Sequence, residues 1–126
     1  MLNANTVDRS LTINASGGVV TFQGIVGGSA TTALADLDIT AALIRVQTIR
    51  INVYDGPGNA TATFAGKVEL GNNATISTVN GTVTNNLVFT DTINADDAAA
   101  QNRTLVITAG TTGNVRFEKS VGDTQA

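Results

Sequence analysis

Two aspartates two residues apart, Asp36 and Asp38, are the side chains of this sequence whose spacing could most readily support catalysis. On an extended strand, residues i and i+2 point to the same face, so both carboxylates would share one surface. Such a pair can act as general acid and base, or can bind calcium. However, no Lys, Arg or His stands at a matching spacing, and Asp38 lies between the apolar Leu37 and Ile39. We therefore expect a solvated strand face and no catalytic residue.

A second group of oxygen-bearing side chains could bind calcium and consists of Asp91, Asn94, Asp96 and Asp97. Carboxylate and amide oxygens are the ligands that this hard cation prefers. The spacing fits neither the EF-hand loop nor the calcium-binding nonapeptide repeat. These four residues are therefore weak metal candidates, and we expect neither a metal nor another cofactor.

A third candidate is the loop 54–59, which holds the only Tyr and the only Pro of the chain beside Gly56 and Gly58. A glycine-rich turn can present an aromatic ring and polar side chains at the surface. Tyr54, Asp55 and Asn59 are the weak candidates for binding a ligand, which would be a glycan or a host protein.

Composition excludes several other classes of function. The 126 residues contain no Cys and no His, which removes disulfides, thiolate nucleophiles, the commonest general base and the usual zinc sites. The net charge is −3, and the seven Lys and Arg residues are scattered, so no basic stripe could bind nucleic acid. No apolar run approaches the roughly 18 to 20 residues of a transmembrane helix, and the start lacks the pattern of a signal peptide. We expect neither nucleic-acid binding nor membrane insertion.

The elements that would position these side chains are short strands. Apolar residues alternate with polar ones at Leu11 and Ile13, at Val20 and Phe22, and at further pairs along the chain. Between Ile44 and Val53 the alternation shifts by one residue near Gln47-Thr48, which predicts a bulge or a corner. Turn signals separate the strands at Gly17-Gly18, Gly27-Gly28, 55–59, 71–73, Asn80-Gly81 and Asn85-Asn86. Residues 30–37 and 96–101 contain helix formers, but we expect loops or single turns there because such short helices are marginal.

The two ends of the sequence are similar to each other. The same residues stand 94 positions apart at Arg9/Arg103, Leu11/Leu105, Ile13/Ile107 and Ala15/Ala109. With one inserted residue near Thr111, the match continues through Gly18/Gly113, Val20/Val115, Phe22/Phe117, Val26/Val121 and Gly27/Gly122. We interpret residues 1–126 as one unit, made of a repeat of about 94 residues (9–102) and the start of a second (103–126).

Two all-β architectures fit these strands. An antiparallel β-sandwich would use about seven strands in this length. Internal repetition favours the other, a parallel β-solenoid of several coils, because each repeat needs to contact only its neighbours. The eighteen residues from Leu87 to Leu105 would fit one coil, but other spacings are less regular, so coil lengths must vary. We expect the 94-residue repeat to span about four coils.

Three segments resemble the repeats of giant bacterial surface proteins, the filamentous-haemagglutinin-like and autotransporter-like β-solenoid adhesins. They are LTINASGGVVTFQGIVGG at 11–28, ALADLDITA at 33–41 and TFAGKVELGNNATI at 63–76. The resemblance extends over nearly the whole chain, although its motifs concern coil packing more than activity. It implies a β-solenoid at the bacterial cell surface or outside the cell. The chain departs from the pattern at 42–53, where Arg45 and Arg50 leave the coil register open.

From these observations we expect a non-enzymatic structural segment, acting as the stalk, spacer or filament body of such an adhesin. Because the last residues stop where the first copy continues, an unfinished coil would leave an open ladder edge. We therefore expect self-association, head to tail or through an edge. The alternative is an adhesin module that binds a glycan or a protein through the loop 54–59. A carbohydrate-acting enzyme of β-helix fold is the third reading, which the lack of a catalytic set disfavours.

Overall fold

The alternating apolar and polar residues form strands, as expected. The structure is a computed structural model that describes residues 2, 8–29, 31–54, 56, 58–96 and 102–122. These residues contain no helix and eleven strands. The strands are β1 (Ser10–Phe22), β2 (Asp36–Val46), β3 (Arg50–Asn52), β4 (Thr61–Leu70), β5 (Ala74–Ser77), β6 (Val79–Asn80), β7 (Val83–Thr84), β8 (Asn86–Phe89), β9 (Ile93–Ala95), β10 (Leu105–Thr108) and β11 (Val115–Phe117).

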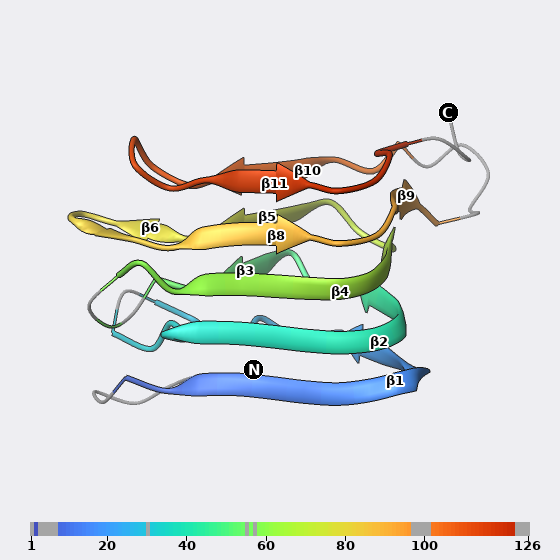
Figure 1. Cartoon of the computed structure of the whole chain (residues 1–126), viewed down its shortest axis with the longest axis horizontal. Helices are drawn as coiled ribbons and strands as arrows, with labels where there is room; N and C mark the ends of the chain where they lie inside the picture. The colour runs from blue at the N-terminus through green and yellow to red at the C-terminus, as the bar shows by residue number, and fades with distance from the viewer. Residues whose placement is uncertain are drawn as a thin grey trace.

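The strands stack as the coils of a parallel β-solenoid (Figure 1). The main sheet has six strands in the order β1-β2-β4-β8-β11, with β9 also paired to β4. A second sheet has the order β10-β5-β3, and the isolated bridges Leu2↔Val26 and Val26↔Ile51 extend it. Every pairing in these two sheets is parallel. The structure thus confirms the solenoid and not the antiparallel sandwich.

Inward-facing residues form continuous apolar columns along the solenoid. In the main sheet, one column consists of Ile13, Ile39, Phe64, Phe89 and Phe117. The phenylalanine rings lie on one another, with centroids 5.0 Å apart for Phe64 and Phe89 and 5.4 Å apart for Phe89 and Phe117. The second sheet adds the column Leu2, Val26, Ile51, Ile76 and Ile107. Burial of these columns is the main source of stability.

The coil length corrects one expectation. Successive members of the Ile13-to-Phe117 column lie 26, 25, 25 and 28 residues apart. The eighteen-residue coil expected from Leu87 to Leu105 is therefore wrong, since Leu87 belongs to the main sheet and Leu105 to the second. The two residues are not equivalent points of successive coils.

The two similar ends of the sequence also occupy different places. Leu11 in β1 stacks on Leu37 in the main sheet, whereas Leu105 in β10 stacks on Ala74 in the second sheet. The residue that lies above Leu11 after four coils is Val115 and not Leu105. The similarity over 94 residues is thus not a stacking period. Two apolar residues with one polar residue between them fit either sheet, because both sheets bury alternate residues.

Residues 10–22, expected as two strands with a turn at Gly17-Gly18, form the single strand β1. Its register to β2 shifts between Ala15 and Val19, so the glycines lie in a bulge. A smaller shift recurs between β2 and β4. There Gly66 adopts a φ of 149°, and a Cβ at this position would collide with the carbonyl oxygen of Ala41. Only glycine fits here, because the backbones of β2 and β4 approach each other so closely.

Two turn predictions are confirmed. The phase shift near Gln47-Thr48 is a corner, since β2 ends at Val46 and β3 begins at Arg50 in the other sheet. This also fixes the coil register that the sequence left open in 42–53, with Val46 on Leu70 and Ile51 on Ile76. The second turn is Asn80-Gly81, which joins β6 and β7 into an antiparallel hairpin that projects from one side (Figure 1). Residues 31–37, which contain helix formers, make a turn and the start of β2, as expected. Residues 97–101 of the second such segment lie outside the described residues.

Candidate functional site

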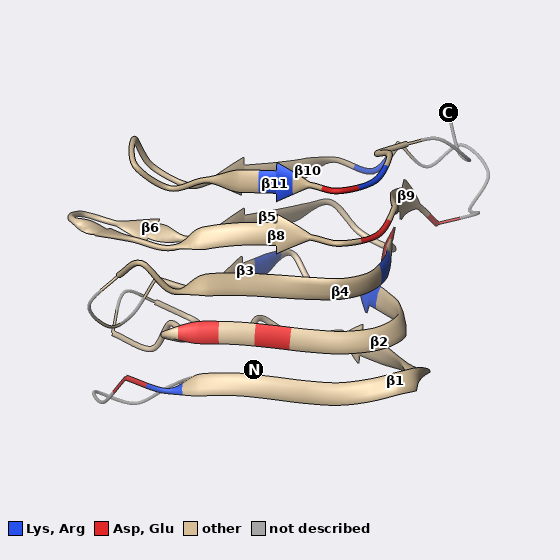
Figure 2. Ribbon diagram, in the orientation of Figure 1, with Lys and Arg blue, Asp and Glu red and all other residues tan. Residues whose placement is uncertain are grey.

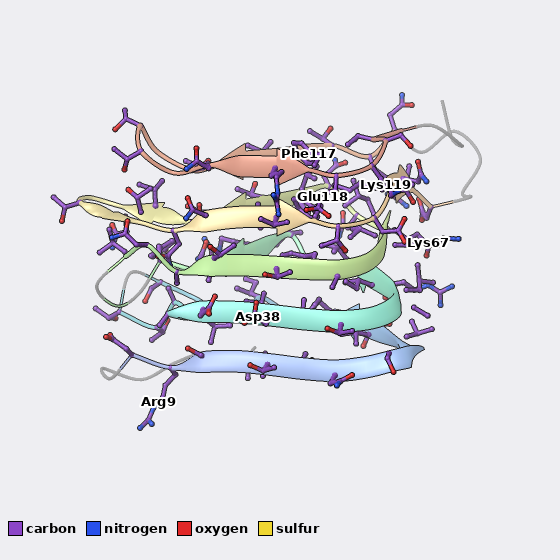
Figure 3. All side chains as sticks on the ribbon, viewed as in Figure 1. Arg9, Asp38, Lys67, Phe117, Glu118 and Lys119 are labelled. Carbon is purple, nitrogen blue, oxygen red and sulfur yellow. The ribbon has the colours of Figure 1, made fainter. Side chains whose placement is uncertain are left out.

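The two aspartates of β2 lie on the outer face of the main sheet, as expected. Leu37 and Ile39 are buried, while Asp36 and Asp38 on the opposite face are half-buried. Asp38 projects outward from β2 (Figure 3). Its ladder neighbours are Thr12 on β1 and Thr63 on β4. This face is polar but holds no basic residue in line with Asp38 on β1 or β4, so the pair has no neighbour there suited to proton transfer.

The environment of Asp36 raises the pKa of its carboxyl group. Partial burial is the larger cause, because it disfavours the charged form, and the negative charge of Asp38 adds to it. The N–H of Leu37 donates a hydrogen bond of 2.9 Å to Asp36 Oδ1 and partly offsets both effects. This raised pKa has a consequence for the pH dependence of stability.

We expect Asp36→Asn to be more stable than the parent chain at pH 7, with the difference shrinking as the pH falls. Because the folded-state pKa lies above the usual 3.8, the folded chain holds this proton more tightly than the unfolded chain. The contribution of Asp36 is thus most favourable below about pH 3.8 and is lost as the pH rises through the folded-state pKa. Urea unfolding of both proteins at pH 3 and pH 7 measures this.

The matched control is Asp96→Asn, for which we expect the opposite sign. The hydrogen bond from Arg103, aided by its charge, lowers the pKa of Asp96, so its contribution is present at neutral pH and is lost on acidification. If both variants shift in the same direction at pH 7, the assignment of these two environments is wrong.

The four metal candidates are only partly brought together. Asp96 accepts two hydrogen bonds from the guanidinium of Arg103, each 2.8 Å long, and Asp91 Oδ1 accepts from the N–H of Thr92. Asn94 lies on β9, and Asp97 lies outside the described residues. In the part of the chain that is described, no three His, Cys, Asp or Glu residues lie together as a metal site would need. These residues stay weak candidates for calcium, and the absence of a metal site remains the prediction.

The loop candidate is held against the projecting hairpin. Asn59 and its neighbours Gly56 and Gly58 all have positive φ, at 64°, 85° and 84°. The N–H of Asn59 donates a 2.8 Å hydrogen bond to the carbonyl oxygen of Thr84 at the end of β7. Tyr54 is half-buried, and Asp55 lies outside the described residues. The loop is therefore attached to the hairpin through its backbone, and ligand binding there remains a prediction.

The side chain that makes the most long-range polar contacts was not a site candidate in the sequence. Asn85 is fully buried, and its Nδ2 donates to the carbonyl oxygens of Ala35 at 3.0 Å and Val53 at 3.1 Å. Its Oδ1 accepts from the N–H of Ala60 at 3.1 Å. The sequence places it in a turn but carries no signal of these contacts. One asparagine thus joins three successive coils.

Several charged residues of both signs gather at one corner of the solenoid (Figure 2). Arg45 and Glu69 are ladder partners on β2 and β4, and Arg45 Nε donates to Glu69 Oε1 at 2.8 Å. Arg103 pairs with Asp96, its Nε lying 2.8 Å from Asp96 Oδ1. Lys67 extends outward near this corner (Figure 3). The exposed Arg45–Glu69 pair joins neighbouring coils, and exposed pairs of this kind contribute little stability. Arg103 and Asp96 are partly buried and lie within one coil, between β9 and β10.

No protein-family model matches the chain, and neither a curated protein nor a solved structure shows significant similarity to it. None of the described residues belongs to a helix long and apolar enough to span a membrane.

Proposed function

We propose that this chain is a non-enzymatic structural segment, serving as the stalk, spacer or filament body of a bacterial adhesin at the cell surface or outside the cell. The observation that carries the proposal is the pair of apolar columns that run through five successive coils. Such a ladder extends in one direction, and each coil contacts chiefly its neighbours. Its length can therefore separate two points mechanically.

The polar contacts support the same role. Asn85, the Arg45–Glu69 pair and the Arg103–Asp96 pair all connect parts of the solenoid to one another. Asn52, also buried, donates from Nδ2 to the carbonyl oxygen of Gly27 at 2.6 Å in the preceding coil. Polar side chains used in this way hold coils together and are not presented to a substrate.

The experiment is to lengthen the solenoid by whole coils. Residues 37–61 form one complete coil, because Leu37 stacks beneath Ala62. Two extra copies of this coil should lengthen the molecule by about 10 Å, from a strand spacing of about 4.8 Å per coil. Energy transfer between dyes at the two ends measures the length, and a scrambled insert of equal length is the control. An unchanged distance, or loss of cooperative unfolding, would count against the spacer.

The second candidate is a glycan- or protein-binding adhesin module, favoured by the loop 54–59. The positive φ at Asn59 is costly for a residue other than glycine, and such conformations concentrate at functional sites. A glycan array that gives a signal lost in Tyr54→Ala but kept in Tyr54→Phe would replace the spacer with this function.

A further inference from the structure

The first strand of the main sheet has an unusual edge. β1 is 13 residues long and lies at the end of the strand order, so among the described residues it pairs with β2 alone. It contains no charged residue, as the unbroken tan ribbon of β1 shows (Figure 2). Exposed edge strands usually carry charges or proline because their free N–H and C=O groups can pair with another chain. β1 lacks both protections.

The core is also open at this edge. Leu11, Ile13, Ala15 and Val20 pack against the core but remain only partly buried. Their stacking partners on β2, which are Leu37, Ile39, Ala41 and Ile44, are buried. Leu2 at the same end of the solenoid is 44% exposed. A strand added beside β1 would cover apolar side chains as well as pair its backbone.

The apolar pattern of β1 is complementary to itself in the antiparallel direction. The bulge makes the inward residues odd-numbered before it, at Leu11 and Ile13, and even-numbered after it, at Val20 and Phe22. If two β1 strands run antiparallel about a point between Ser16 and Gly17, Leu11 faces Phe22 and Ile13 faces Val20. Thr12 then faces Thr21 on the outer side. All these inward positions meet inward positions, which is what fixes strand register.

The opposite end of the solenoid is a poorer match for β1. There the inward residues Phe117 and Val121 are four residues apart, whereas Ile13 and Val20 are seven apart. A parallel head-to-tail stack that places Phe117 on Ile13 would therefore leave Val121 opposite Gly17. Keeping both Phe117 on Ile13 and Val121 on Val20 would need a three-residue bulge, larger than the two-residue and one-residue shifts within the solenoid.

We propose that β1 is a dimerisation edge that pairs antiparallel with β1 of a second copy of this chain, about a two-fold axis between Ser16 and Gly17. The two bulges then lie opposite each other, and no charged residue of the strands faces another. A two-fold interface of this kind uses the same patch on both copies and closes on itself. The inference goes beyond the proposed function and makes the self-association expected from the sequence one end-to-end dimer in place of an open filament.

The test uses paired cysteines in this cysteine-free chain. Thr12 and Thr21 are exposed, and in the dimer each faces the other across the two-fold axis. Cα atoms of directly opposite residues in an antiparallel pair lie about 4.5 to 5.5 Å apart, within the range that a disulfide spans. Within one chain these residues are about 25 Å apart along the strand, so they cannot bond to each other. Thr12→Cys/Thr21→Cys should give a covalent dimer under mild oxidation, at least tenfold faster than the controls.

Two controls separate the alternatives. Asn14→Cys/Thr21→Cys places the cysteines two residues out of register and should crosslink slowly. Thr12→Cys/Arg116→Cys reports head-to-tail stacking, because Arg116 stands at the same ladder position four coils later. Multimers from this last variant, or no dimer from Thr12→Cys/Thr21→Cys, would overturn the proposal. Either result leaves the spacer role standing if the coil-insertion experiment lengthens the molecule.

Discussion

Replacing Asn85 with alanine should destabilise the solenoid by roughly 3 to 9 kcal/mol, from about 1 to 3 kcal/mol for each of three polar groups left without this partner. The change removes the hydrogen bonds to the carbonyl oxygens of Ala35 and Val53 and to the N–H of Ala60. Since domains are stable by only about 5 to 15 kcal/mol, much of the variant would be unfolded in moderate urea. Equilibrium unfolding followed by circular dichroism gives the difference.

The matched control is the neighbouring residue Asn86, whose side chain accepts hydrogen bonds from Asn114 at the surface. Asn86→Ala should cost about 0.5 to 1.5 kcal/mol, the usual net value of a hydrogen bond. Equal losses in the two variants would show that Asn85 does not hold three coils together.

Replacing Phe89 with alanine should cost about 3 to 5 kcal/mol, the usual penalty for removing a buried phenylalanine. Phe89 is fully buried and lies between the rings of Phe64 and Phe117, so truncation leaves a cavity in the middle of a core column. Neighbouring side chains cannot readily move in to fill this cavity, because the hydrogen-bonded ladder on both sides fixes the spacing of the coils. Urea unfolding measures the loss of stability.

Phe117→Ala is the control for position within the column. Its ring stacks on Phe89 but is 44% exposed, so its removal should cost clearly less than removal of Phe89. A loss at Phe117 as large as that at Phe89 would mean that the described end of the column is more deeply buried than the structure shows.

Sequence reasoning was sufficient for the fold class and for the face on which most side chains lie. The alternation around Leu37, Asp38 and Ile39 predicts which of them are buried, and the phase shift near Gln47 predicts a corner. These features depend only on nearest neighbours along one strand, so local pattern determines them. The Asn80-Gly81 hairpin belongs to the same class, because turn chemistry is local.

Coil length and register could not be obtained in this way. The similarity of 11–15 and 105–109 suggests equivalent positions, yet one segment lies in the main sheet and the other in the second. Both sheets accept the same period of two, so the pattern cannot distinguish them. The coil register is set by the number of residues that each coil needs in its corners and loops.

The polar contacts between distant residues could not be predicted from the sequence either. Arg103 and Asp96 are seven residues apart with an undescribed segment between them, and Asn85 reaches Ala35 across 50 residues. Asparagine is also a common turn residue, so its type alone does not separate a surface turn from a buried donor. Only the folded coils bring these partners together.

The near-constant spacing of the columns has a consequence for folding kinetics. Ladder contacts in the main sheet join residues 24 to 28 positions apart, so each coil closes a chain loop of similar length. Counted over these ladder contacts alone, the mean separation is about a fifth of the chain length, in the range of all-β domains that fold in milliseconds to seconds. The entropic cost of closing one coil does not depend on how many coils are already stacked. A longer array of the same kind would therefore fold by repeated addition at a similar rate per coil, with the first closure as the slow step.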